Sequence, residues 1–367
     1  MPGKPSAIEA LSPRFKVLLN DQALSSDEQK TLEADVLSIN VSEDIDAVSM
    51  FDVTLESWDE SKQKLTWLDS ETFELGNEVE IQMGFETKLK TVFIGQITGL
   101  EPEFSSTDNA KLVVRGHDRR HLLLRGKKTK SFAKMSDAAI AKKIAQVHGL
   151  TPKVVETKPK LTLEQVLQHN QTDFEFLQER ARRIGYELLV IGKELHFRPH
   201  ANDEKEVMTL SAKNDLLEFS PRLSTMTQVP QVEVRGWSMT EKKAVVGIAN
   251  AAKEPSKMAG TTLGPDQTKK AFGKSVEKAS HTLISDAVST KAEADLLAIG
   301  QLKDMAIAYI TAEGTSQGLG DLRAGTTVKI TDAGTKFSGL YYLTSVQHSF
   351  SEDNGYETKF TARRNST

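Results

Sequence analysis

Two strand-rich stretches of this chain repeat the same order of short segments, and this repetition constrains the fold more than any other feature. The first reads GNEVEI, FIGQITGLEPEFSS and AKLVVRGHDR, and the last reads GTTVKI, FSGLYYLTSVQHSFSE and ETKFTARRN. The alignment matches Gly76 with Gly325, Val79 with Val328, Ile81 with Ile330, Gly95 with Gly339, Phe104-Ser105 with Phe350-Ser351, and Arg115 approximately with Arg363. Short β motifs also recur by chance, so a duplication and a coincidence both stay open here.

The repeated segments carry the period-two pattern of half-buried strands. GNEVEIQM alternates cleanly, with Val79, Ile81 and Met83 on one face. Further strands are expected at 14–19, 36–41, 50–55, 91–97, 111–115 and 231–237. Many short strands separated by Gly and Asp/Asn turns favour small antiparallel barrels. If the repetition is a duplication, the chain holds two such barrels, with corners shaped by Gly76, Gly95, Gly325 and Gly339.

The middle of the chain changes to helical patterns. Ser136 can cap a helix that runs to about His148, with apolar positions Ile140, Ile144 and Val147 on one face. Gly149 can end this helix. The stretch TLEQ at 162–165 offers a capping box, the pattern that starts a helix.

The stretch NQTDFEFLQERARRIGYELLV, 170–190, combines a helix start, a helix stop and a strand. Thr172 to Glu175 form a second capping box, and Gly185 stops the helix. Phe174, Leu177, Ala181 and Ile184 follow at spacings of three, four and three, and we expect this face to pack the helix. Residues 186–197 then read as a hairpin.

These patterns predict an α+β fold that is mainly β, with two antiparallel β-barrels linked by an α/β region. Residues 240–280 are rich in Lys, Ala, Gly and Ser and read as a long flexible insertion, and a last helix is expected from Thr290 to about Ala312. The expected division is a flexible tail (1–13), a first β-barrel domain (14–120), a connecting α/β region (121–215), and a second β-barrel domain (216–367) that contains the insertion and the last helix.

Composition excludes several classes of protein. The chain has no cysteine, which rules out disulfides, cysteine nucleophiles and cysteine-ligated zinc. Its net charge of −4, from 47 basic and 51 acidic residues, gives no general nucleic-acid footprint. No apolar run is long enough for a membrane span, and the N-terminus lacks the apolar core of a signal peptide. We expect synthesis in the cytoplasm and no cofactor.

The residues that could bind a metal or act as an acid or base also have structural explanations. His117 and His121 are four apart, the spacing of helical metal sites, but two arginines between them disfavour a cation. His196 and His200 flank a hairpin end and are no stronger candidates. His169, Asp173, Glu175 and Glu179 could supply acid–base chemistry, but acids are also favoured at a helix N-terminus. We therefore predict no metal or catalytic residue.

Other motifs are weaker. No nucleotide-binding or nucleophile motif occurs, and the basic run RGKKTK at 125–130 reads as a solvated loop. The stretch 134–150 resembles the helix–strand pattern of LysM modules that bind peptidoglycan. Binding or degradation of peptidoglycan in the cell wall is therefore the alternative function.

Three blocks in order resemble a known family. They are VRGHDRRHLLLRGKKTKSFAKMSDAAIAKKIAQVHGL, QHNQTDFEFLQERARRIGYELLVIGKELHF, and the region from TKAEADLLAIGQLKDMAIAYITAEG to FTARRN. Together with the β segments they resemble the late control D proteins of contractile-tailed phages, which are related to the N-terminal hub region of VgrG spike proteins and to extracellular contractile injection systems. The family motif falls on Thr172, Asp173, Phe174, Phe176, Leu177, Ile184, Gly185 and Tyr186.

This resemblance implies a homotrimeric baseplate hub. Two tube-protein-like barrels per chain would give a ring of pseudo-sixfold symmetry that joins a trimeric spike protein to the hexameric first ring of tail tube protein, among other baseplate proteins. The expected location is the assembled baseplate, after synthesis in the bacterial cytoplasm. VgrG proteins continue beyond the hub whereas this sequence ends at Thr367, so the spike is expected to be a separate chain or to have been removed.

Overall fold

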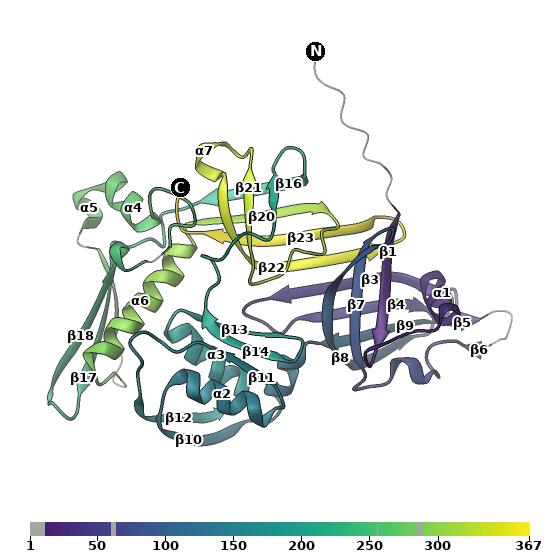
Figure 1. The fold of residues 1–367 in the computed structure, drawn as a ribbon, viewed down its shortest axis with the longest axis horizontal. Helices are drawn as coiled ribbons and strands as arrows, with labels where there is room; N and C mark the ends of the chain where they lie inside the picture. The colour runs from purple at the N-terminus through teal and green to yellow at the C-terminus, as the bar shows by residue number, and fades with distance from the viewer. Residues whose placement is uncertain (1–11, 60–63, 255, 278, 285–287) are drawn as a thin grey trace, which may run out of the picture.

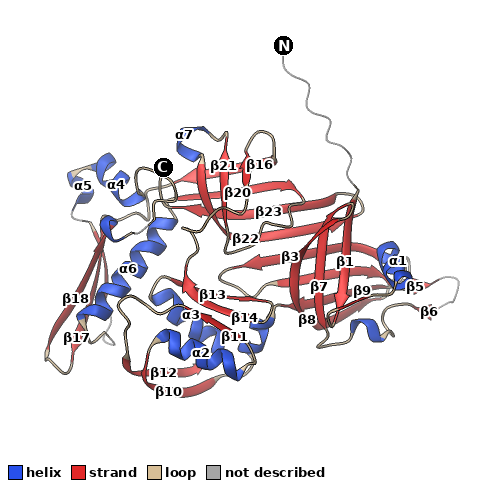
Figure 2. Cartoon of the chain, viewed as in Figure 1, coloured by secondary structure: helices blue, strands red, loops and turns tan. Residues whose placement is uncertain are grey.

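The computed structural model describes residues 12–59, 64–254, 256–277, 279–284 and 288–367. Most of the expected N-terminal tail, residues 1–11, lies outside the described residues. Figure 1 shows one β region at the top and the other at the right of the molecule, with an α/β region at the bottom and a smaller sheet with helices at the left. Strands dominate the architecture, as the sequence predicts (Figure 2).

Each β region is built from six strands in the same spatial order. In the first region the order is β1 (Pro13–Leu19), β7 (Glu78–Phe85), β8 (Lys88–Glu103), β9 (Lys111–His117), β4 (Met50–Glu56) and β3 (Val36–Asp44). In the second it is β15 (Thr209–Ser211), β21 (Thr327–Thr331), β22 (Gly339–Ser351), β23 (Gly355–Arg364), β20 (Ile310–Gln317) and β16 (Leu216–Leu223). The six strands also follow one another along the chain in the same sequence. The two regions therefore share one strand order, although β1 pairs antiparallel with β7 whereas β15 pairs parallel with β21. We call them the first and second repeats.

Two irregularities in the strand ladders fall at the same places in both repeats, while a third, between Ile81 and Gln82 in the β7–β8 ladder, has no counterpart in the β21–β22 ladder. The β3–β4 ladder shifts register between Val36 and Ser38, and the β16–β20 ladder shifts between Leu216 and Glu218. The β8–β9 and β22–β23 ladders likewise share one shift, after Ile97 in the first repeat and after Leu343 in the second. Bulges are specific backbone features rather than random defects, so these coincidences support the internal repeat and fix its register.

The bulges confirm part of the sequence alignment and correct the rest. The backbone N–H of Gly76 donates to the carbonyl of Ile97, and that of Gly325 donates to the equivalent Leu343, each at 2.8 Å. The pairings of Val79 with Val328 and of Ile81 with Ile330 are also confirmed. Two pairings were wrong by two residues, because Gly95 corresponds to Tyr341 and Arg115 corresponds to Thr361.

The prediction of two separate barrels needs correction. Strand β22 pairs with β21 through its first residues and then pairs antiparallel with β3, from Ser345 opposite Asp44 to Ser351 opposite Ser38. The two repeats therefore merge into one 13-stranded sheet. Within the described residues, neither repeat closes its ladder into a barrel. Sequence periodicity shows which residues form strands but not which distant strands become neighbours.

The connecting region contains two α-helices, one 3-10 helix and two small sheets, β10–β12 and β11–β14–β13. Its elements are η2 (Arg119–Leu124), β10 (Lys128–Met135), α2 (Asp137–Val147), β11 (Thr151–Val154), β12 (Leu163–Gln171), α3 (Asp173–Arg183), β13 (Tyr186–Ile191) and β14 (Glu194–Pro199). Both predicted helix starts, at Ser136 and Thr172, and the hairpin are confirmed.

Two local expectations for this region were wrong. The TLEQ stretch starts no helix, because β12 pairs antiparallel with β10 and buries Val166 and Gln168 on one face. Val147, the last residue of α2, is 68% exposed and does not join the buried face of Ile140 and Ile144.

Residues 240–280 were expected to be a flexible insertion, but the described part is built of regular elements. They are β18 (Lys243–Asn250), η3 (Ala251–Lys253), α4 (Gly264–Phe272) and α5 (Lys274–Glu277), while residues 255 and 278 lie outside the described residues. Strand β18 pairs with β17 (Gln231–Ser238), which also pairs with β19 (Ser280–Ile284). Their apolar face, including Val234 and Val245, is buried in the core that α6 (Lys291–Ile307) shares. The last helix ends at Ile307 rather than Ala312, because β20 begins at Ile310.

Three main cores hold the molecule together. Each repeat has its own, represented by Phe51 and Val114 in the first and by Tyr341 and Val346 in the second. The third core runs from the connecting region, through Leu177, into the β17–β18–β19 sheet and α6. The inserted sheet thus packs with the connecting region. The remaining small elements are β2 (Gln22–Ala23), α1 (Ser26–Asp35), β5 (Trp58–Asp59), β6 (Lys64–Leu65), η1 (Glu71–Phe73) and α7 (Gly334–Phe337).

Candidate functional site

The N-terminus of α3 has a complete capping box. The Oγ1 atom of Thr172 accepts a hydrogen bond from the backbone N–H of Glu175 at 3.1 Å, and Glu175 Oε2 accepts one from the backbone N–H of Thr172 at 2.8 Å. Two N–H groups that the helix leaves without intrahelical acceptors are thus bonded. The carboxylate of Glu175 is used to start the helix.

Asp173 is buried beside the capping box and holds three donors. Its carboxylate accepts hydrogen bonds from Lys128 Nζ, from His148 Nε2 at 2.7 Å, and from Gln168 Nε2 at 3.0 Å. Burial opposes ionisation, but the bonds from His148, Lys128 and Gln168 outweigh it and lower the pKa of Asp173. A carboxylate stabilised in this way is a poor proton acceptor and a good anchor between β10, α2, β12 and α3.

The other acidic residues of this stretch do not converge with Asp173. Glu179 Oε2 accepts a hydrogen bond from the side chain of Gln171 at 2.7 Å, and His169 is exposed on β12. The stretch therefore organises a fold and does not present an acid–base pair.

The apolar residues of the family motif pack the α3 helix. Phe176 stacks on Phe132 with ring centres 5.6 Å apart, and Leu177 is fully buried. Phe174 is half-buried against the same core. Ile184 and Tyr186 are buried at the helix end, where the Tyr186 ring lies 5.5 Å from that of Phe197.

Gly185 lets α3 approach α6. It has φ of +65°, a conformation that side-chain-bearing residues rarely adopt. A Cβ atom at Gly185 would lie 2.8 Å from the Cα of Gly300 on α6. The contact between these helices therefore depends on glycine at both positions. Of the four glycines expected at barrel corners, Gly76 and Gly325 occupy turns before strands, Gly95 lies within β8, and Gly339 begins β22.

Buried ion pairs join the parts of the chain. Arg323, which precedes β21, bonds to Glu43 on β3 and so links the two repeats. Glu187 on β13 accepts hydrogen bonds from Tyr342 on β22 and from Arg198 Nε, the latter at 2.8 Å. Burial raises the pKa of Glu187 to about 7 despite these donors.

The candidate metal-binding histidines bond to ordinary side chains. His117 Nδ1 lies 2.7 Å from Thr98 Oγ1, and His121 Nε2 lies 3.0 Å from Gln96 Oε1. His200 stacks on Tyr342, and His196 lies near Glu194. Across the described residues, no group of three or more His, Cys, Asp or Glu side chains could hold a metal ion. Among the helices of this described part, none has the length and apolarity needed to cross a membrane.

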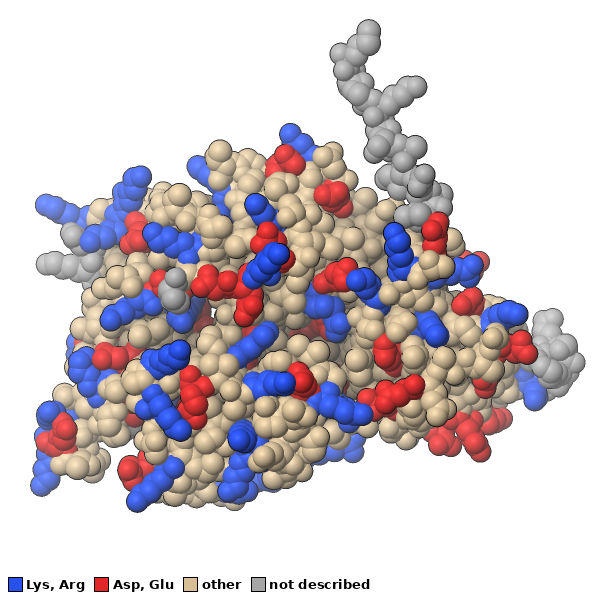
Figure 3. Space-filling view, in the orientation of Figure 1, with Lys and Arg blue, Asp and Glu red and all other residues tan. Residues whose placement is uncertain are grey.

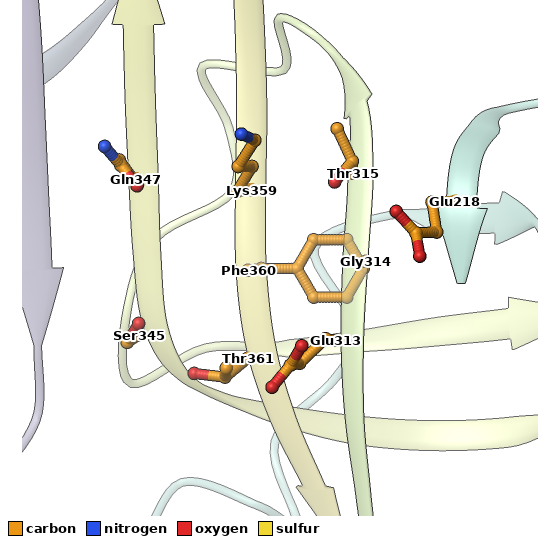
Figure 4. Close-up of a pocket in the computed structure, with 9 residues that line it drawn as sticks. All are labelled: Glu218, Glu313, Gly314, Thr315, Ser345, Gln347, Lys359, Phe360 and Thr361. Atoms are coloured by element: carbon orange, nitrogen blue, oxygen red, sulfur yellow. The ribbon is translucent and has the colours of Figure 1, made fainter. Parts of the chain in front are cut away.

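A polar hollow lies on the sheet of the second repeat. It has a volume of about 220 Å³, and Glu218, Lys359 and Gln347 line it from three strands (Figure 4). Its remaining lining residues are Glu313, Gly314, Thr315, Ser345, Phe360 and Thr361. The hollow reaches β16, the last strand of the sheet. Sequence reasoning missed this surface, although exposed polar residues alternate with buried ones along β20 and β23.

The visible surface carries no large field of one charge. Figure 3 shows basic and acidic side chains interspersed over all parts of this face. Electrostatic steering of a strongly charged polymer is therefore not indicated here.

The sequence profile of the family described as the Alg8 N-terminal domain matches residues 13–352, which is most of the chain. This chain belongs to the Alg8 N-terminal domain family. No curated protein sequence matches it.

Solved structures show where else this Alg8 N-terminal domain fold occurs. The 43 kDa tail protein of prophage MuSo2 from Shewanella oneidensis has 13% identity and a TM-score of 0.68, over 96% of this chain and 98% of that one. A tail protein from Neisseria meningitidis has 14% identity and a TM-score of 0.66, over 96% and 97% of the two chains. The E. coli c3393 protein, described as a type VI secretion component similar to the T4 tail proteins gp27 and gp5, has 17% identity and a TM-score of 0.60, over 90% and 74%. The expected baseplate hub-like fold is confirmed.

Proposed function

We propose that this chain is the structural hub of the baseplate in a contractile phage tail or a tail-like injection system, and that it has no enzymatic activity. The observation that carries the proposal is the repetition of six strands, in one order and with two shared bulges, within a single chain. Three such chains contain six equivalent units. A homotrimer can therefore offer a pseudo-sixfold ring on one face and threefold symmetry on the other.

The hub acts by binding. Its pseudo-sixfold face seats the hexameric first ring of the tail tube, and its threefold face seats a trimeric spike protein, with other baseplate proteins around them. The chain is made in the bacterial cytoplasm and is incorporated into the particle. No cofactor or nucleic-acid specificity is part of this role. The likeness to tail proteins and to a type VI secretion component supports this placement.

The residues of the family motif serve this role as scaffold. Asp173 joins four elements of the connecting region, and Gly185 sets the contact with α6. The turns at Gly76 and Gly325 set equivalent strand entries in the two repeats. These positions fix the orientation of the repeats rather than contact a substrate.

End-on electron micrographs of the purified protein test the proposal, together with sedimentation on purified cell walls. The hub predicts particles with six similar lobes and no enrichment with peptidoglycan. Single-lobed monomers that sediment with cell walls, or that degrade them, would contradict the hub. That result would favour the peptidoglycan-directed alternative.

A further inference from the structure

Two strand edges of the continuous sheet are unpaired in the described residues, one on its end strand β16 and one on the projecting second half of β8. Among the residues that the structure describes, β16 pairs with β20 on one side and with no strand on the other. Strand β8 pairs with β7 up to Gln96, and its second half, as far as Glu103, pairs with β9 alone within that described part. Residues 101–109 are exposed. Each edge presents backbone donors and acceptors that another strand can use.

The equivalents of these two edges already meet at the centre of the chain. Strand β3 of the first repeat corresponds to β16 of the second, and β22 of the second corresponds to β8 of the first. Strands β3 and β22 pair antiparallel where the repeats join. The β3–β22 ladder thus shows how the equivalents of β16 and β8 pair when two repeats are joined.

We propose that β16 of one protomer pairs antiparallel with the second half of β8 of the next protomer, in the register that β3 and β22 adopt. This inference rests on the proposed trimeric hub. The shared bulges align β3 with β16, at 36–38 and 216–218, and β8 with β22, after residues 97 and 343. Each β3–β22 residue pair can therefore be converted into the equivalent pair between β16 and β8. The transferred pairs are Gly99–Ser224, Leu100–Leu223, Glu101–Arg222, Pro102–Pro221, Glu103–Ser220, Phe104–Phe219 and Ser105–Glu218, each between neighbouring protomers.

Side chains in this register are complementary. Glu101 faces Arg222, and both are exposed in the single chain. Glu101 already forms an ion pair with Arg115, at 3.0 Å between Oε1 and Nε, and 56% of its side chain stays exposed and accessible to a second cation. Phe104, which is 69% exposed, faces Phe219. Opposite charges and aromatic residues directly across a ladder stabilise the pairing of strands.

Two prolines face each other at the centre of the register, where they remove the hydrogen bonds of one pair from the proposed ladder. Ile45 N–H donates to the Thr344 carbonyl at 3.0 Å, which makes alternate pairs of the β3–β22 ladder hydrogen-bonded. The pair of Val41 with His348 belongs to that set, and Pro102 and Pro221 replace it between protomers. Proline at an edge discourages pairing with arbitrary strands, while the pairs on either side keep their N–H groups.

The proposed contact repeats one type of junction around the trimer. Three β3–β22 junctions within chains would alternate with three β16–β8 junctions between chains. In such a closed trimer no strand edge would be left open along this seam.

Engineered disulfides test the register, and the chain has no cysteine of its own to interfere. Glu103→Cys with Ser220→Cys places two thiols opposite each other, at a separation that a disulfide can span. The control, Glu101→Cys with Glu218→Cys, is out of register by four residues on the same strands. After mild oxidation we expect covalent dimers and trimers on denaturing gels from the first variant, and about tenfold less product from the control.

Charge reversal provides a second readout. Glu101→Arg and Arg222→Glu should each raise the trimer dissociation constant about tenfold, and the double reversal should restore most of the affinity. A trimer that forms no disulfide between cysteines at positions 103 and 220, and whose dissociation constant is unchanged by the charge reversals, would overturn the proposed pairing. The hub proposal would remain intact. A chain that stays monomeric in every variant, including the parent, would overturn both.

Discussion

Arg323 donates from Nε to the carboxylate of Glu43 at 2.8 Å and from NH1 to the carbonyl of Thr91 at 2.8 Å, so one side chain ties the second repeat to two strands of the first. Glu43 also accepts from the backbone N–H of Ala324 at 3.3 Å. Burial opposes the charge of Arg323, but Glu43 outweighs it and raises the pKa of the guanidinium. The bridge lies where β3 meets β22, the junction from which the trimer contact is inferred.

Replacement of Arg323 by Met should therefore weaken the joint between the repeats. Glu43 would remain in the interior without its cation, and we expect a loss of about 2 to 4 kcal/mol in the free energy of unfolding. Urea denaturation of the purified variant measures this loss. Glu43→Gln combined with Arg323→Met should recover part of the stability. Arg14→Met breaks an exposed bridge to Glu33 and should change it by less than about 1 kcal/mol.

The contact between α3 and α6 predicts unequal effects of alanine at two glycines. Gly185 and Gly149 both have positive φ, at +65° and +68°. A Cβ atom at Gly149 meets nothing within 4 Å, whereas one at Gly185 meets the backbone of Gly300 at 2.8 Å. Gly149→Ala should cost about 1 kcal/mol from backbone strain, and Gly185→Ala about 2 to 4 kcal/mol because of the added clash. Equal losses in parallel denaturant titrations would contradict the close approach.

Asp173 should stabilise the connecting region without any catalytic role. Asp173→Asn removes the charge that His148, Lys128 and Gln168 bind, with an expected loss of about 1 to 3 kcal/mol near neutral pH. Because the folded pKa of Asp173 is lowered, its contribution is present above its ordinary pKa of 3.8 and disappears as pH falls below it. Stability differences between the parent and the variant at pH 7 and pH 3 test this. A gap that widens toward pH 3 would contradict the assignment.

His348 should make the protein sensitive to acid. Burial lowers the pKa of His348 to about 4, with Nε2 bonded to the Leu322 carbonyl at 3.1 Å and Nδ1 near Tyr356 Oη at 2.9 Å. The unfolded chain takes up this proton at its ordinary pKa of 6.5, so the stabilisation is present above pH 6.5 and is lost as pH falls toward 4. The stabilisation that is lost in this way amounts to at most about 3 kcal/mol.

The pH dependence due to His348 is measured as the difference in stability between the parent protein and His348→Gln, because other buried groups also titrate. Burial raises the pKa of Glu187 and of Asp304 to about 7, and these carboxyl groups stabilise the fold at low pH and lose that effect as pH rises toward 7. Their pH dependence opposes that of His348 in the parent protein. The stability advantage of the parent over His348→Gln should shrink between pH 7 and pH 4.5, as measured by denaturation at each pH. An advantage that stays constant would show that His348 does not titrate in this range.

Local patterns in the sequence predicted where helices and strands lie better than they predicted which of these elements contact each other. Side-chain spacing and caps are local, so they located α3, its capping box at Thr172 and the stop at Gly185. The pairing of β3 with β22 joins residues about 300 positions apart, and no periodicity encodes it. The same limit explains the partners of Asp173, since Lys128 and His148 reach it from other elements.

Tertiary contacts also overrode local signals. TLEQ has the residues of a capping box, but pairing with β10 and burial of Val166 make it a strand. In residues 240–280, abundant Lys and Gly concealed the short apolar face that Val245 and Ala249 contribute to the shared core. The β16 and β8 edges could be recognised only after the two repeats were superposed by their bulges.

The absolute mass of the purified protein in solution, measured by light scattering over a wide range of concentrations, tests the hub most directly. The account predicts a particle of three times the chain mass of 40.5 kDa. A mass that stays at one chain at every concentration, and also after addition of the spike protein of the same particle, would contradict it.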